Sequence, residues 1–551
     1  MEDQDQNPPK LSKIKLNKIK PSKKLHIITY NVRSLSSYER LLELSEALKE
    51  IKYDVIGLCE IRRAGNKIEE YENFILFHTG LNPGIYGIGF LVKKNLKNNI
   101  ESYIGLTERV ALLNMKFEDV QMSIIQVYAP TEKASEDEIE EFYQTINKAV
   151  KLAHKLYIVM GDLNAKIGHP KQEEYLITKP NGYGIRNTRG QRLIDFAIEN
   201  KLAILNTYFK KKTKNKWTWL SPDGNYKNEI DFILSNRPHI FQNIDVLNIN
   251  YPSDHRPVRA TIMLQCLKKS RSQYKNQCAA LKNEEKIIKY KECLVRHKSH
   301  YPLDLQKDPC IQTYYDNLVK IITKSLHAAS THKIGGIKSK IMSEKTLSLL
   351  KRRQELQKTK HKTRAMKNKL AALYKLASKY IKNDYINHRY NTIHKHLKLT
   401  GSTKKAYKEL RTNKTWIDGL NRNGTRSYNR RDIISIATDF YKSLYRERAP
   451  SQDSVYYNNN PVMTNTNDIP RIEVSEVEST LQSLKTDKSP GPDHITNEAL
   501  KTGSEMLVLQ LTDLFNGIMK TGVTPSQWSE SHIILLYKKG DSKDTKKLQT
   551  N

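Results

Sequence analysis

The stretch from residue 157 to residue 164 reads Tyr157-Ile158-Val159-Met160-Gly161-Asp162-Leu163-Asn164, and it determines our interpretation of the fold. Its apolar part, Leu156 to Met160, has the length of a β-strand. Two polar residues, Asp162 and Asn164, follow directly where that strand ends. An aspartate or asparagine after a strand is most often a turn former, so this stretch alone identifies no site.

The same arrangement recurs on both sides of this stretch. The strands predicted at residues 25–29, 54–58 and 122–127 run into Asn31, Glu60 and Tyr128, respectively. Strand ends that meet at one edge of a sheet form a cleft in which α/β proteins usually bind ligands. Two further polar segments, residues 229–231 and 253–255, flank the last predicted strands. The sequence therefore predicts one cleft that gathers side chains from distant positions.

Amphipathic helices are predicted between these strands. Ser36 and Glu39 form a Ser-x-x-Glu capping box, and Ser135 and Glu138 form a second one. A third helix is expected at residues 190–200. Residues 217–234 contain a Ser-Pro-Asp-Gly turn and are predicted to form a β-hairpin. Alternating strands and helices predict an α/β domain over residues 25–262.

Taken in chain order, these motifs resemble the exonuclease-endonuclease-phosphatase superfamily, and most closely the apurinic-type endonucleases of non-long-terminal-repeat retrotransposons. The motifs that carry the resemblance are Thr29-Tyr30-Asn31, Glu60, Val127-Tyr128-Ala129-Pro130, Gly161-Asp162-Leu163-Asn164, Thr218-Trp219, Ile230-Asp231 and Ser253-Asp254-His255. The resemblance implies a four-layer sandwich, in which two mixed β-sheets pack face to face and are flanked by helices.

Phosphodiester hydrolysis requires an attacking water, stabilisation of the phosphoryl oxygens and a neutralised leaving group. Glu60 is a hard oxygen ligand suited to Mg²⁺ or Mn²⁺, and Asn31 and Asp254 are expected to complete the metal site. No small-molecule organic cofactor is expected.

The resemblance also implies catalytic roles for other residues of the motifs. It implies that Asp162 activates the water, that Asn164 holds the phosphate or that water, and that His255, oriented by Asp231, bonds a phosphate oxygen. Tyr128 is expected to support the phosphate through its hydroxyl. Purely structural roles are the alternatives for two of these residues: Tyr128 as a buried aromatic at the sheet edge, and Asn164 as a turn former.

The net charge of +34 is distributed unevenly along the chain. Residues 25–262 contain 32 Lys and Arg against 29 Asp and Glu, whereas residues 263–551 contain 54 against 27. Residues 351–400 alone contain 15 basic and 2 acidic residues, interleaved with tyrosines. Such density attracts phosphate backbones, although a solvated helical face kept soluble by its charge would have the same composition.

Three features favour DNA as the partner. The RNA of the retrotransposon itself is a further possible partner. Lys211, Lys212 and Lys214 precede Trp219 in the predicted hairpin and are candidates for nucleic-acid binding. The alternative is a solvated loop beside two core tryptophans. The second feature is the basic region described above. The third lies near the C-terminus, where residues 489–495 and 533–541 resemble the start of the reverse transcriptase of the same retrotransposons.

In that C-terminal resemblance, Lys538 and Lys539 are candidates for contacting a template or triphosphate. The paired aspartates that would bind the polymerase metals do not follow, so we expect a truncated fingers segment without polymerase activity. The expected organisation is a disordered basic leader (1–24), the endonuclease/exonuclease/phosphatase domain (25–262), a mostly α-helical basic region (263–467) and a truncated reverse transcriptase segment (468–551).

Composition also limits where the chain is expected to act. Its apolar stretches are too short for a membrane span, so no membrane partner is expected. Five cysteines without a Cys-x-x-Cys pair argue against a disulfide framework or zinc site and favour a reducing, intracellular setting. Within the cell, a nuclear location is expected. The oligomeric state is not predicted.

The leading hypothesis from the sequence is a metal-dependent endonuclease that nicks DNA. The alternatives are a degenerate or domesticated remnant that binds nucleic acid without cutting it, and a phosphoesterase of lipid or inositol phosphates within the same superfamily.

Overall fold

The computed structural model describes residues 22–171, 174–265, 281, 284–306, 310–329, 341–359, 363–422, 424–444, 470–486, 488, 490–530, 535–537 and 548–550. Lys538 and Lys539 lie outside these residues. The chain divides into two compact units: one comprises residues 1–270, 338–445 and 541–545, and the other comprises residues 271–337, 446–540 and 546–551. Helices of the basic region at 263–467 contribute to both units.

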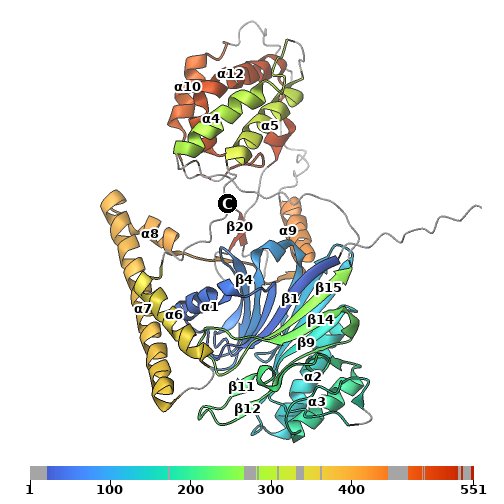
Figure 1. The fold of residues 1–551 in the computed structure, drawn as a ribbon. Coiled ribbons are helices and arrows are strands. Elements are labelled where there is room, and N and C mark those ends of the chain that lie inside the picture. Colours follow the sequence, from blue (N-terminus) through green and yellow to red (C-terminus); the bar gives the residue numbers. More distant parts are fainter. Residues whose placement is uncertain are drawn as a thin grey trace, which may run out of the picture. The chain divides into compact units, whose positions relative to one another are not determined.

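The first unit contains a large mixed sheet of eight strands (Figure 1). Its strand order is β14 (Phe241–Val246), β15 (Val258–Gln265), β1 (Ser22–Asn31), β2 (Val55–Cys59), β5 (Ile88–Lys93), β4 (Phe74–Gly80), β3 (Gly65–Glu70) and β16 (Lys414–Thr415). Strands β1 and β2 are parallel, and the other neighbours are antiparallel.

A second mixed sheet of six strands lies in the same unit. Its order is β10 (Ala203–Ile204), β13 (Asp231–Ser235), β9 (Tyr157–Asp162), β8 (Val120–Tyr128), β7 (Val110–Phe117) and β6 (Ile100–Gly105). Only β8 and β9 are parallel among these pairs of described strands. Each sheet therefore has one parallel pair near its centre, and the four strands of these two pairs end at the polar residues predicted from the sequence.

Three hydrophobic cores hold the layers together. The central core joins the two sheets through residues such as Ile27, Phe77 and Ile124. A second core packs α2 (Glu136–Leu152) and α3 (Thr188–Glu199) on the six-stranded sheet, and a third packs α1 (Tyr38–Ala47) on the eight-stranded sheet. The expected fold class, two large mixed sheets flanked by helices, is confirmed for this unit.

The helix starts show one correct and one wrong prediction. Ser135 caps α2, because its side chain accepts a hydrogen bond from the backbone of Glu138. The predicted cap of α1 at Ser36 is wrong by one residue, since Ser37 accepts from the backbone of Arg40. The hydroxyl of Ser36 instead forms a hydrogen bond with the hydroxyl of Ser34 in the loop before the helix.

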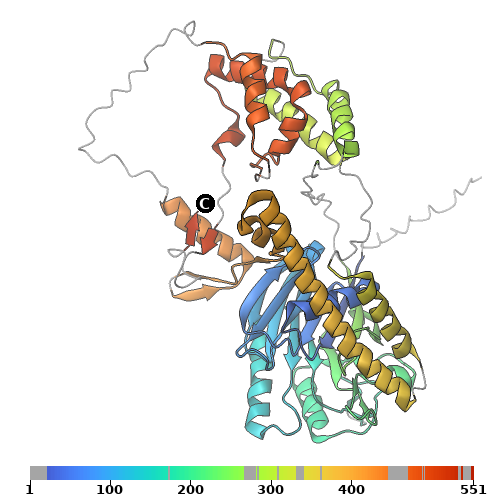
Figure 2. The same cartoon turned by 90° about the vertical axis from the view of Figure 1, so that its left-hand side faces the viewer.

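Helices from the basic region dock onto this α/β domain. They are α6 (Glu344–Lys358), α7 (Arg364–Thr400), α8 (Thr403–Leu410) and α9 (Arg430–Leu444), together with the small hairpin of β17 (Leu420–Arg422) and β18 (Thr425–Ser427). Long α7 runs along the side of the unit (Figures 1 and 2). Strand β16 extends the eight-stranded sheet by pairing with β3.

The attachment of α6 centres on one buried arginine. Arg353 is fully buried and donates from Nη1 to Oε1 of buried Glu43 on α1, over 2.6 Å. Its Nε and Nη2 donate to the side-chain and backbone oxygens of Asn250, over 2.7 and 2.8 Å. The Asn250 amide in turn donates to the carbonyl of Leu350. Such a fully bonded guanidinium fixes the orientation of α6 on the domain.

The second unit is mainly helical in its described residues. Helices α4 (Glu284–Lys298) and α5 (Ile311–Ala329) share a core with α11 (Asn497–Thr502) and α12 (Ser504–Thr521). Helix α10 (Val474–Ser483) packs on α12, and β19 (Leu535–Tyr537) pairs with β20 (Leu548–Thr550). The reverse transcriptase resemblance of this part stays a prediction. No described helix of the chain has the length and apolarity that a membrane crossing requires.

The Arg353 contact predicts a large effect of a single substitution. Arg353→Met should destabilise the first unit by about 3–5 kcal/mol, because it leaves the Glu43 carboxylate buried with only Arg40 as a partner. Urea unfolding measures the loss, and hydrogen exchange should show faster exchange in α6 and α7. The matched control is Arg352→Met, which changes an exposed neighbour on the same helix. Equal stability of the two variants would contradict the prediction.

Candidate active site

The pairing of neighbouring strands places the polar residues at their ends next to one another. In the six-stranded sheet, Tyr128 pairs with Asp162, and Asp162 pairs with Asp231, so three candidate residues lie side by side on β8, β9 and β13. In the other sheet, Asn31 pairs with Cys59, the residue before Glu60. The polar residues predicted from the sequence therefore lie together where β1, β2, β8, β9 and β13 begin or end, at the place where the cleft was predicted.

Asn31 joins the two sheets at this cleft. Its Nδ2 donates to Oε1 of Glu60 over 2.9 Å and to Oδ2 of Asp162 over 3.0 Å. The hydroxyl of Tyr128 donates to the same Glu60 oxygen over 3.2 Å, and Arg62 donates to the other Glu60 oxygen over 2.6 Å. Burial raises the pKa of Tyr128, so the phenol stays protonated and acts as a donor.

His255 lies between two aspartates in the deepest part of the site. Its Nδ1 is 2.9 Å from Oδ2 of Asp231, and its Nε2 is 3.6 Å from Oδ2 of Asp162. All three side chains are buried. Burial alone would lower the pKa of His255, but the carboxylates of Asp231 and Asp162 outweigh it and raise that pKa. The imidazole is therefore held as a cation, with its Nδ1–H directed at Asp231.

Burial has the opposite effect on Asp162. It raises the pKa of this carboxyl group, and the nearby charge of Asp231 adds to the rise, whereas the His255 cation lowers it. The carboxylate also accepts hydrogen bonds from the Asn31 side chain and from the backbone of Asn164, over 3.0 and 3.1 Å. A buried carboxylate with a raised pKa is suited to accept a proton near neutral pH.

Asp254 belongs to a loop that is tied to the same cleft. The hydroxyl of Ser253 donates to the backbone carbonyl of Asn31 over 2.7 Å and accepts from the backbone of His255. The Asp254 carboxylate accepts from the indole nitrogen of Trp219 over 3.3 Å. Trp219 lies on β11 (Trp219–Leu220), which pairs with β12 (Lys227–Asn228) in the predicted hairpin. Trp219 thus has a positioning contact that the sequence did not predict.

Strained backbone concentrates around this network. Arg33, two residues after Asn31, has a φ of 59°, and Glu60, Arg62 and Asn164 have φ values of 55°, 58° and 45°. Left-handed backbone is costly for residues other than glycine and persists where the surroundings fix it. Asn164 is fixed by its amide, which donates to the carbonyl of Ala129 over 2.8 Å. Asn164 therefore helps to close the turn while its backbone holds Asp162, and its contact with the phosphate or the attacking water stays a prediction.

The donor set fits a divalent cation. Glu60, Asp254 and the amide oxygen of Asn31 are hard oxygen donors of the kind that Mg²⁺ and Mn²⁺ prefer. The buried group Asp162, Asp231 and His255 also has ligand atoms within 4.8 Å of one another, and Oδ1 of Asp231 is buried without a hydrogen-bond partner. The structure therefore offers two sets of ligands for a cation, one around Glu60 and one formed by Asp162, Asp231 and His255.

The predicted nucleic-acid residues have mixed surroundings. Lys212 and Lys214 are exposed beside η5 (Thr213–Asn215). Lys211 is bound instead to Asn243 and Asp245, over 2.8 and 2.7 Å. The half-buried Trp217 stacks against the guanidinium of Arg256, 4.3 Å from the ring centre.

Sequence reasoning missed two contributors to the site. Arg62 neutralises Glu60, and its position two residues after a candidate metal ligand was an available signal. The hydroxyl of Thr218 accepts from the backbones of Ile230 and Asp231, over 3.0 and 3.2 Å, which sets the start of β13. Thr218 belongs to a motif that supported the resemblance, but its hydrogen bonds could not be read from spacing.

Comparisons with known proteins agree with this geometry. Residues 28–255 match the Endonuclease/Exonuclease/phosphatase family. Craniofacial development protein 2 of Bos taurus is 31% identical over 209 residues, which cover 37% of this chain and 35% of the relative. A probable RNA-directed DNA polymerase from transposon BS of Drosophila melanogaster is 31% identical over 74 residues, which cover 13% of this chain and 8% of the relative.

The matched part spans only about a third of the length of the bovine relative. Among solved structures, the endonuclease domain of TRAS1, a telomere-specific non-LTR retrotransposon, is similar over 43% of this chain and 98% of that chain, with 16% identity and a TM-score of 0.32. Residues 28–255 therefore match the Endonuclease/Exonuclease/phosphatase family, and this matched region contains the buried group of Asp162, Asp231 and His255.

Proposed function

We propose that this domain is a divalent-metal-dependent DNA endonuclease, which nicks one strand by hydrolysing a phosphodiester bond. The observation that carries the proposal is the continuous set of contacts from Glu60 through Asn31 and Asp162 to His255 and Asp231. It combines a site for a cation, a buried base and a buried cationic donor, which are the groups that phosphodiester hydrolysis requires.

In the proposed reaction, a cation held by Glu60, with Asn31 and Asp254, would neutralise charge on the phosphate and its leaving oxygen. Asp162 accepts a proton from the attacking water, and the Asn31 amide keeps its carboxylate directed into the cleft. Nε2 of His255, which faces Asp162 at 3.6 Å, would donate to a non-bridging phosphate oxygen when the substrate is bound. Asp231 holds the ring, and Tyr128 fixes the Glu60 carboxylate.

DNA is the substrate that the surrounding residues support best. Lys212 and Lys214 project from the segment that leads into β11, whose Trp219 contacts Asp254. Docked helices of the same unit add a dense positive charge that a small inositol phosphate would not need. The similarity to a protein named as a transposon polymerase supports an origin in a mobile element.

Plasmid nicking tests the assignment directly. With Mg²⁺ or Mn²⁺ the purified chain should convert supercoiled plasmid to open circles, and EDTA should abolish this conversion. Glu60→Gln and Asp162→Asn should each lower the nicking rate by about 10²–10⁴-fold, because one weakens cation binding and the other removes the base. Glu72→Gln, which changes an exposed carboxylate outside the cleft, is the matched control.

Two results would count against the assignment. Unchanged nicking in the Glu60 and Asp162 variants would show that another site, or a contaminating nuclease, cuts the plasmid. Salt-sensitive DNA binding without cleavage at any metal concentration would favour the binding-only alternative. Turnover of inositol polyphosphates, with no nicking, would identify a small-molecule phosphoesterase instead.

The pKa of Asp162 predicts the acid limb of the pH profile. Because burial raises this pKa, the carboxyl group is protonated in acid and cannot accept a proton from water. The nicking rate should therefore rise as pH increases above the ordinary carboxyl range of about 4, until Asp162 is ionised. Residual nicking by Asp162→Asn should lack this limb. A wild-type rate that is flat between pH 5 and about 8 would rule out Asp162 as the base.

A further inference from the structure

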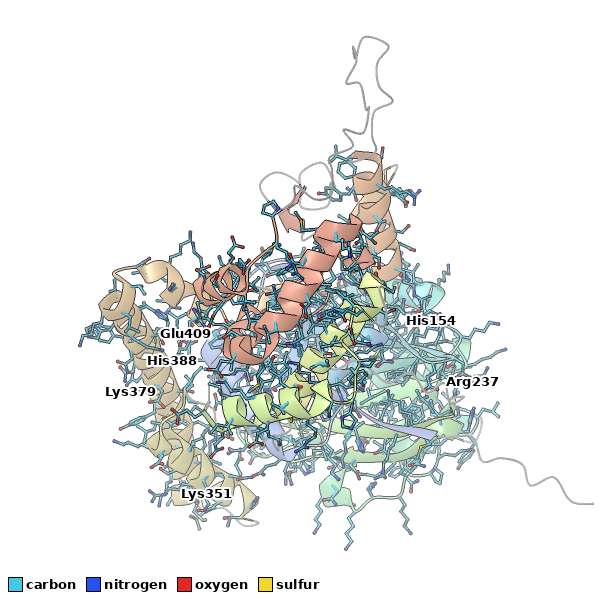
Figure 3. The ribbon with its side chains drawn as sticks, turned by 90° about the horizontal axis from the view of Figure 1, so that it is seen from above. His154, Arg237, Lys351, Lys379, His388 and Glu409 are labelled. Atoms are coloured by element: carbon cyan, nitrogen blue, oxygen red, sulfur yellow. The ribbon has the colours of Figure 1, made fainter. Side chains whose placement is uncertain are left out.

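Helix α7 presents a row of lysines to solvent. Lys375, Lys379 and Lys382 follow one another at helical spacing and are all exposed. Leu373, Ala377 and Ile381 are buried, and they occupy the opposite side of the helix. In Figure 3, Lys379 points outward from this helix, away from the sheets. The face that α7 turns to solvent is therefore strongly cationic.

This charge lacks acidic partners on the helix itself. Asp384 is the single acidic residue between residues 364 and 400, which also contain nine Lys and Arg. Its carboxylate is already engaged at the start of α6, where it accepts from Ser343 and from the Thr346 hydroxyl. Lysines three and four residues apart repel one another and destabilise an isolated helix. An external polyanion would remove that repulsion.

Helix α7 is fixed to the domain that carries the active site. Tyr385 packs against Tyr38 of α1, with ring centres 5.1 Å apart, and Tyr374 lies under the Arg353 guanidinium at 4.8 Å. Near the start of α7, the amine of Lys367 lies beside Gly224. Its Nζ is 3.6 Å from the point where a side chain on that glycine would begin. Gly224 is in the turn between β11 and β12, the hairpin that contacts Asp254 through Trp219.

We propose that the exposed face of α7 is an arm that binds the sugar–phosphate backbone of the nucleic acid whose cleavage takes place in the candidate active site. The inference rests on the proposed function, because it assigns the arm to the same substrate. The segment from Lys367 to Lys398 spans about 46 Å at 1.5 Å per residue, so it reaches well beyond the hairpin. Its lysines contact phosphates and carry no base specificity.

Equilibrium binding of the full chain tests the arm without requiring cleavage. The probe is a fluorescein-labelled 30-base-pair DNA duplex in EDTA, titrated at several KCl concentrations, with an RNA duplex of the same sequence in a second arm. The triple variant Lys375→Gln, Lys379→Gln, Lys382→Gln should bind about tenfold or more weakly at 0.1 M salt, and the slope of log K against log salt should fall by about 2.7. A loss of affinity confined to the RNA duplex would overturn the proposal, because DNA is the proposed substrate.

A matched variant removes the same charge elsewhere. Lys148→Gln, Lys151→Gln, Lys155→Gln changes three exposed lysines on or just after α2, and it should alter the slope by less than half as much. Equal losses of DNA affinity in the two triple variants would overturn the proposal that α7 is a binding arm. Binding of the wild type to phosphatidylserine vesicles but to neither duplex would also overturn it. If wild type binds but never nicks, the proposed function fails while the comparison of the variants still decides the role of α7.

Discussion

A single side-chain amide at the end of β1 holds the two halves of the candidate site together. Asn31 belongs to the eight-stranded sheet, and its Nδ2 reaches Glu60 of that sheet and Asp162 of the other. One amide nitrogen therefore bridges carboxylates that belong to the two different sheets. The packed apolar core between the sheets fixes the distance that Asn31 spans.

The electrostatics of the site follow from this closure. Four carboxylates, from Glu60, Asp162, Asp231 and Asp254, are near one cleft, and Arg62 and the His255 cation balance only part of their charge. Because the negative charge of these carboxylates is only partly balanced, the site favours a bound cation. A phosphate group can then bind to that cation. The same set resists an anionic substrate that arrives without a metal, which explains why the proposed chemistry needs both.

The sequence predicted the residues of the site better than it predicted the contacts that hold the surrounding helices in place. Buried strands that end at Asn31, Tyr128 and Asp162 could be predicted because strand ends are marked locally by a change from apolar to polar residues. Their motif order then supplied the family. The α1 cap was misplaced because two adjacent serines offer equal local signals, and only the bond from Arg40 to Ser37 distinguishes them. The contact of Arg353 with Glu43, 310 residues apart in sequence, leaves no local pattern at all.

The same long-range contact explains how a basic helix is fixed to the unit that carries the candidate site. The apolar cluster beneath α6 and α7 is small, with Met342, Leu350, Ala377 and Ile381 as its buried members. So few apolar side chains hold two helices weakly and in no particular direction. The guanidinium of Arg353 supplies the direction, because its hydrogen bonds to Glu43 and Asn250 are satisfied in one orientation of α6. Helix α7, packed against α6, therefore keeps its cationic face in a fixed position relative to the strand ends, which a flexible basic tail could not do.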